Sequence, residues 1–196
     1  GMPRFESAVV GNLELTWLIP LSLIGTICGW LYFVSEHASE ALAHAIGARP
    51  VVKAMLAGLA LAICGTVLPY TLFAGETQAD VLMETYLTIP AGVLIATGLV
   101  KAMLTPALIN LGWRGGHFFP VIFSGVSLGY GLAILTGADP VFCVAVCTAS
   151  TMGAVMRQPV MVVGLLLMCF PLKGIVCMII AAVIAAGIPL PKPLRK

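Results

Sequence analysis

The sequence predicts an all-α, polytopic membrane protein, and both its composition and the pattern of its apolar runs indicate this class. The chain has 196 residues, of which 60% are apolar and 9% are charged, and its mean hydropathy is +1.09. Ordinary soluble domains are charged at about a quarter of their positions. The composition therefore predicts several helices that cross a lipid bilayer. We expect one transmembrane domain over residues 2–196 and interpret Gly1, which precedes Met2, as a scar of tag removal.

Apolar runs in the first part of the sequence have about the length of a membrane span. They cover residues 15–34, 50–73 and 90–111. Residues 35–48 predict a polar continuation of the first helix, and residues 74–88 predict a polar surface loop with a short helix. Lys101 lies inside the third run, where an ionisable side chain is costly and normally faces protein or water.

The last third of the sequence has shorter apolar runs, and this difference points to a binding site. The runs cover residues 120–135, 141–155, 160–170 and 175–188, with proline, glycine or single charges between them. A uniform bundle needs about 20 residues for each span. Short, tilted and broken helices are tolerated at membrane depth where they pack against protein or line a cavity, and they accompany the binding sites of transporters.

The stretch that leads into the first of these short runs has the pattern of a helix start. It reads GWRGGHFFPVIFSGVSLGYG, residues 112–131. Pro120 has no N–H group and a fixed φ, so it suits the first turn of a helix. We expect Gly115 and Gly116 to adopt backbone conformations that are closed to other residues.

Amides at a helix start have no partner within the helix, and this predicts an anion site. We expect the N–H groups of His117 and Phe118 to lie there, at the positive end of the helix dipole. The candidate site comprises Gly115, Gly116, His117, Phe118, Phe119 and Pro120. The His117 imidazole either adds a proton-dependent contribution or only occupies the helix entry. Arg114 either draws anions toward the site or lies among the lipid headgroups.

Other groups with the chemistry of metal ligands or acid–base residues have simpler structural interpretations. They are the pair Cys143 and Cys147, the pair Glu40 and His44, and the carboxylates Glu76, Asp80 and Glu84. The cysteines are expected to be small core residues, and the Glu–His pair to belong to a solvated helix end. The carboxylates are expected on the surface, although they are also compatible with a proton relay. We therefore expect no metal site.

The distribution of charge predicts which segments face the cytoplasm. The tail, with Lys192, Arg195 and Lys196, and the basic loop within residues 35–53 are expected inside. The acidic loop at residues 74–88 and the N-terminus are then expected outside. The net charge of +2 is too small to indicate a nucleic-acid partner.

Two motifs in the second half of the chain resemble those of one transporter family. The segment GGHFFP at residues 115–120 resembles the GxFxP signature of CLC chloride channels and proton-coupled anion exchangers. The segment VAVCTASTMGAVMRQPVMVVGLLLMCF is similar to a later family segment in which a small-residue helix ends at Arg-x-Pro, here Arg157 and Pro159. The resemblance covers nearly the whole chain, but only the second of the family's two inverted repeats. It implies half of a CLC-like inverted-repeat fold that starts on the outer side.

The sequence also departs from the family pattern. The first-repeat motifs GSGIP, with an anion-binding serine, and GREGP, with the gating glutamate, are absent together with that repeat. Met168 stands where family members often carry a glutamate. The family's anion site is completed by a tyrosine after a KPL-like sequence, whereas here KPL is followed by Arg195.

The resemblance implies transport of chloride or a similar small anion, as a channel or as an exchanger, without a cofactor other than a bound halide. It also implies a homodimer through residues 160–187, where small residues allow close helix contact. These are Gly164, Gly174, Ala181, Ala182, Ala185 and Ala186. A separate or missing N-terminal half, or a second copy in the opposite orientation, would complete the pore.

Two other functions remain as alternatives to transport. The chain is also compatible with a non-transporting scaffold or assembly subunit that keeps the half-fold. An intramembrane enzyme would need to use His117 or the acidic residues at 76–84, but no nucleophile–base pair at a suitable spacing supports it, so we expect no enzyme. In each case we expect a multi-pass protein of a cell membrane, such as the inner membrane of a bacterium.

Overall fold

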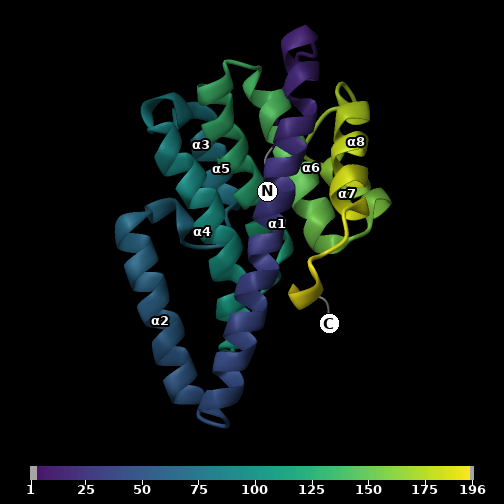
Figure 1. Cartoon of the computed structure of the whole chain (residues 1–196). Helices are drawn as coiled ribbons and strands as arrows, with labels where there is room; N and C mark the ends of the chain where they lie inside the picture. Colours follow the sequence, from purple (N-terminus) through teal and green to yellow (C-terminus); the bar gives the residue numbers. More distant parts are fainter. Residues whose placement is uncertain (1–3, 195–196) are drawn as a thin grey trace.

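The computed structural model describes residues 4–194, which form helices joined by short turns (Figure 1). The α-helices are α1 (Asn12–Ile46), α2 (Pro50–Val67), α3 (Glu76–Thr85), α4 (Ala91–Asn110), α5 (Phe118–Thr136), α6 (Pro140–Met156), α7 (Pro159–Leu166) and α8 (Ile175–Gly187). Short 3-10 helices are η1 (Pro69–Thr71), η2 (Tyr86–Thr88) and η3 (Lys192–Leu194). No β-strand occurs within residues 4–194, so the predicted all-α class is confirmed.

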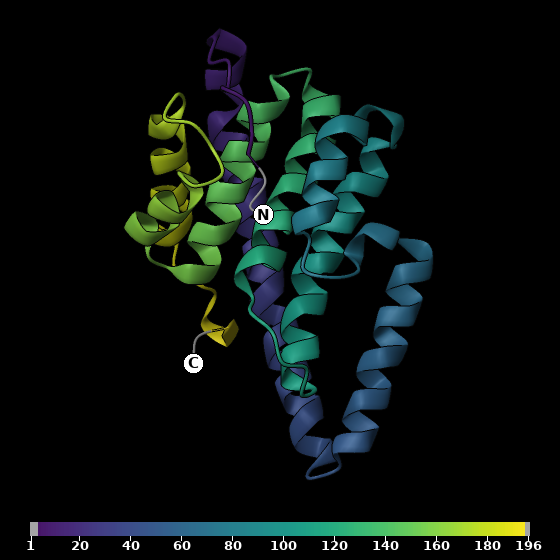
Figure 2. The same cartoon turned by 180° about the vertical axis from the view of Figure 1, so that it is seen from behind.

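The longest helix, α1, extends along the molecule, while α2 stands apart from the bundle (Figures 1 and 2). α1 has 35 residues and includes the predicted polar continuation without a break, until Gly47 ends it with a φ of 68°. α2 is mostly exposed or half-buried, and Ala57 is its buried residue. Four helices, α1, α2, α4 and α5, are long and apolar enough to cross a membrane, whereas α6 and α8 are shorter. The predicted mixture of full-length and short apolar helices is therefore confirmed, except that α5, expected as a short run over residues 120–135, has 19 residues and the length of a span.

The central helix of the bundle is α6, because α1, α5, α7 and α8 all pack against it. Its residues 142–154 are buried. A Cβ atom at Gly125 of α5 would lie 2.4 Å from the Cα atom of Thr148 on α6. One at Gly129 would lie 2.5 Å from the Cα atom of Val144. Glycine thus lets the two helix backbones touch, which is how helices gain packing energy in lipid.

The small residues of α8 face α6, and this corrects one expectation. Ala181, Ala182 and Ala185 are fully buried, and Gly153 of α6 fits against Ala182. The sequence predicted that these alanines form a face for self-association. This prediction is wrong, because they are buried against the rest of the chain. The outer face of α8 consists of Val176, Ile179, Ile180 and Val183.

The acidic segment folds as predicted, into the short surface helix α3 followed by η2. Ala79 and Leu82 are buried on the side of α3 that packs toward α5, while Asp80 and Glu84 are exposed. Figure 1 shows α3 toward the end of the bundle at which α1 begins, and the turn between α1 and α2 at the opposite end. This arrangement agrees with the predicted separation of the acidic loop from the basic turn.

We expect Gly129→Ala to destabilise the fold, because the new Cβ atom must displace the backbone of α6 rather than a flexible side chain. Overpacking of this kind costs about 1–3 kcal/mol. Gly58→Ala on α2 is a matched control, since a Cβ atom there meets nothing within 4 Å. Thermal unfolding in detergent should give a lower midpoint for Gly129→Ala and an unchanged or higher one for Gly58→Ala, because alanine favours a helix over glycine. Equal midpoints for the two variants would contradict the packing of α5 on α6.

Candidate functional site

The loop that joins α4 to α5, residues 111–117, carries the start of α5 into the interior of the molecule. Figure 2 shows this loop rising from the lower end of α4, and α5 begins about halfway along the length of α1. The helix begins at Phe118, slightly earlier than the predicted start at Pro120, and it is buried over residues 121–133. Its first residues, 117–120, are half-buried and lie part-way along the bundle rather than at one of its ends.

The glycines of this loop have a different role from the one that the sequence suggested. Gly112 is the residue with a left-handed conformation, at a φ of 97°, and it ends α4 by donating to the carbonyl oxygen of Ile109. Gly115 and Gly116 do not have a positive φ, so the expectation that they adopt conformations closed to other residues is wrong. A Cβ atom at either position would meet nothing within 4 Å. These two glycines therefore leave open space beside the backbone.

The amides at the start of α5 have no partner within the helix, as the sequence predicted, while their binding of an anion stays a prediction. The first hydrogen bond of the helix runs from the N–H of Val121 to the carbonyl oxygen of His117, at 3.1 Å. Pro120 lies in the first turn and has no N–H. The N–H groups of residues 117–119 therefore precede the helical ladder, where free amides and the helix dipole favour a negative charge.

The side chain of His117 lies on the side of the helix start that faces α1. Its ring stacks on Phe118, with ring centroids 4.8 Å apart, and lies 6.4 Å from the ring of Tyr32 on α1. The half-buried imidazole does not border the cavity described next. This position favours its interpretation as a helix-entry residue packed among aromatic rings.

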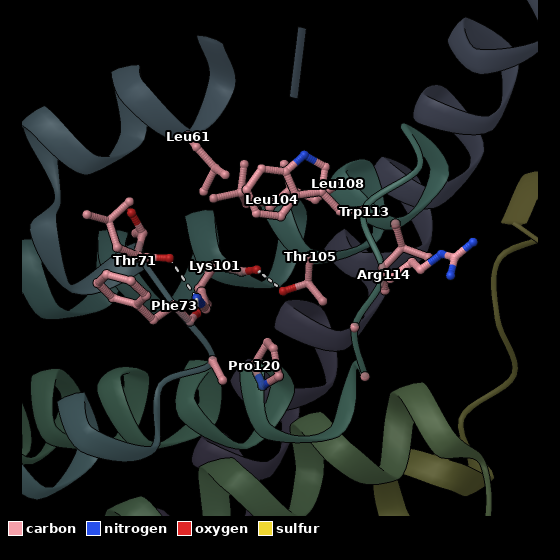
Figure 3. A pocket seen from close by; sticks show the side chains of 15 residues that line it. Leu61, Thr71, Phe73, Lys101, Leu104, Thr105, Leu108, Trp113, Arg114 and Pro120 are labelled. Carbon is pink, nitrogen blue, oxygen red and sulfur yellow. Dashed lines mark hydrogen bonds between the residues drawn. The ribbon is translucent and has the colours of Figure 1, made fainter. Parts of the chain in front are cut away.

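A cavity of about 350 Å³ lies on the other side of the loop, and Figure 3 shows the residues around it. Gly115, Gly116 and Pro120 form the part of its wall that belongs to the predicted site, whereas Phe118 and Phe119 do not line it. Most of the remaining wall is apolar and includes Leu61, Leu104, Leu108 and Trp113. A mostly apolar cavity with a few convergent polar groups is typical of a small-ligand site.

Lys101 of α4 also lines this cavity, although it is not among the residues of the predicted site. It is only 4% exposed, and its Nζ atom donates to the carbonyl oxygens of Thr71, at 2.6 Å, and Phe73 (Figure 3). The signal that points to it is its position as a lone charge inside an apolar run. The contact between α4 and the turn after α2, which brings the ammonium group to the cavity wall, could not be predicted from the sequence.

Arg114 lies at the edge of the same cavity but is exposed. Figure 3 shows its guanidinium group directed away from Lys101. Its two predicted roles, steering of anions and contact with lipid headgroups, both remain predictions.

The second family-like motif has a structural role at the junction of α6 and α7. Arg157 ends α6 with a left-handed φ of 58°, and its Nη1 atom donates to the carbonyl oxygen of Ile188 at 2.7 Å. Pro159 then opens α7, as the Arg-x-Pro pattern predicts. Met168, which follows α7, is 59% exposed. Through its hydrogen bond to Ile188, Arg157 connects the end of α6 to the residue that follows α8.

The other groups that the sequence singled out lie apart from the cavity. Cys143 and Cys147 are buried within α6, in agreement with their interpretation as core residues. His44 is exposed near the end of α1, and the carboxylates of α3 lie toward the other end of the bundle (Figure 1). The structure does not bring any of them to the start of α5.

Short apolar helices around a helix start that lies part-way along the bundle are typical of membrane transport proteins. Comparison with known families identifies the particular one: the profile of the voltage gated chloride channel family matches residues 4–189. The chain therefore belongs to the voltage gated chloride channel family, as its motifs predicted.

A comparison with solved structures agrees with this assignment. The crystal structure of a CLC-type fluoride/proton antiporter is similar, with a TM-score of 0.76 and 20% sequence identity. The match covers 100% of this chain and 50% of the antiporter chain, so this chain spans half the length of that protein. The similarity shows a shared fold. No match was found among curated proteins.

Proposed function

We propose that the chain takes part in the transport of a small inorganic anion across a cell membrane, with the start of α5 as the binding site. One observation supports this most directly: residues 117–119, whose amides have no partner within the helix, are half-buried and lie between the cavity-lining residues Gly116 and Pro120. Amides aligned with a helix dipole bind an anion without a full positive charge on the ligand-binding loop. Chloride or another halide is the proposed ligand, and no other cofactor is required.

We also propose that this single transmembrane domain acts as one half of a CLC-type assembly. Its match to half of the antiporter chain supports the assignment to one repeat. The complementary half would come from a separate polypeptide, from a longer chain or from a second copy in the opposite orientation. The charge pattern favours an external N-terminus and an internal C-terminus.

The backbone site leads to unequal expectations for two substitutions in the GGHFFP segment. Gly116→Val should keep the fold, since its Cβ atom meets no neighbour, but should fill the space beside the free amides. We expect chloride or fluoride flux into vesicles to fall by roughly ten- to a hundredfold, the cost of a lost charge-assisted contact. His117→Ala should keep most of the flux at neutral pH, because the imidazole stacks on Phe118 away from the cavity. Gly58→Val on α2 is the control.

Two results of this assay would argue against the proposal. If Gly116→Val transported normally while His117→Ala did not, the imidazole rather than the backbone would make the site. If the unmodified chain moved neither anion in vesicles with its complementary half present, the scaffold function would replace the transport function.

We further propose that the chain self-associates through the outer face of α7 and α8. The exposed side chains Ile179 and Val183 lie one turn apart on α8, with 42% and 51% exposure. Ile179→Trp and Val183→Trp should weaken the dimer in lipid vesicles by roughly tenfold, measured as the subunit concentration for half-maximal cross-linking, if each disrupts one packed contact. Val51→Trp on α2 is a control at a site that is 69% exposed.

Cross-linking that is unchanged in both α8 variants would place the interface elsewhere. Ala182→Trp is unsuitable for this test, because Ala182 is buried against α6 and a large side chain there would disrupt the monomer.

A further inference from the structure

Lys101 is the charged side chain that the fold buries within the described residues 4–194. An ammonium group in the interior of a membrane protein is costly unless it is paired or faces water. Its two assigned hydrogen bonds go to the carbonyl oxygens of Thr71 and Phe73, which are neutral acceptors. Among the residues that the structure describes, no carboxylate forms an ion pair with it. Its charge is therefore oriented but not neutralised.

The ammonium group also keeps hydrogen-bonding capacity for a ligand. Lysine has three N–H donors and no acceptor. Two of the three donate to the turn that follows α2, which holds the group at the cavity wall (Figure 3). One donor is left over for an acceptor in the cavity.

The cavity beside Lys101 is suited to such an acceptor. Its wall combines Lys101 and Thr105 of α4 with the open backbone at Gly115 and Gly116. At about 350 Å³ it exceeds the volume of a bare halide and leaves room for water molecules around one. A monovalent anion there would neutralise the buried ammonium group, whereas a neutral ligand would leave the charge unpaired.

We propose that this cavity is an anion subsite adjoining the start of α5, and that Lys101 supplies its positive charge. The ligand is a small monovalent inorganic anion of the halide class. The role of this subsite rests on the transport function proposed above. An anion bound by Lys101 would lie next to the free amides of α5. The ammonium group is a binding residue here, and its bonds to the α2–α3 turn position it.

The test is a titration of the purified full chain with sodium chloride and sodium fluoride, followed by calorimetry and by the thermal unfolding midpoint. Lys101→Met removes the charge at similar side-chain length, Lys101→Arg keeps it, and Lys173→Met removes an exposed charge away from the cavity. We expect Lys101→Met to bind the anion roughly ten- to a hundredfold more weakly and to lose the anion-induced rise in midpoint. Lys101→Arg and Lys173→Met should retain both.

A purely structural role for Lys101 gives a different result. Lys101→Met would then lower the midpoint without anion but leave the anion affinity and the anion-induced rise unchanged, and this outcome would overturn the subsite. If Lys101→Met fails to fold, Lys101→Gln replaces it, because the amide still donates to the turn but carries no charge.

Flux measurements in vesicles separate this inference from the proposed function. If anion binding depends on Lys101 but no flux is seen, the proposed subsite is supported and the proposed transport function is contradicted. If the chain transports anions but Lys101→Met leaves the anion affinity unchanged, only the proposed subsite is contradicted. Absence of binding by the unmodified chain would overturn both.

Discussion

The direct contact between the backbones of α5 and α6 is the constraint on which the rest of the structure depends. At Gly125 and Gly129 no side chain separates the two helices, so the axis of α5 is fixed against the most buried helix of the bundle. α6 is held in turn by α1 and α8 on its other sides. Because α5 cannot slide or tilt without parting from α6, the position of its first turn inside the molecule is set by packing rather than by the loop before it.

This fixed first turn has two chemically different sides. Toward α1, the ring of His117 stacks on Phe118 and lies near the ring of Tyr32. Toward α4, the open backbone at Gly115 and Gly116 shares a cavity with the buried ammonium group of Lys101. The second side is the one on which we propose that an anion binds, because a positive charge attracts an anion more strongly near the protein interior than in bulk water. The fold thus separates an aromatic anchor from an electropositive cavity within one helix turn.

The sequence predicted the elements of this fold well because its breaks are made by residues with strong local preferences. Pro140 and Pro159 open α6 and α7, and the predicted start at Pro120 lies within the first turn of α5. The sequence did not predict which side of each helix faces its neighbours. Helices of a membrane protein are apolar on their lipid-facing and buried sides alike, so hydropathy did not show that Ala182 faces α6. The position of the Lys101 ammonium group at the cavity wall depends on a tertiary contact with Thr71, which no local sequence pattern encodes.

The most direct test of the proposed anion site is a crystal of the chain grown in bromide, with the anomalous signal used to locate the anion. We expect a bromide peak within hydrogen-bonding distance of the amides of residues 117–119, on the side of the cavity that Lys101 borders. A peak beside the imidazole of His117 on the α1 side, or no peak at the start of α5 in a crystal that holds bromide elsewhere, would contradict it.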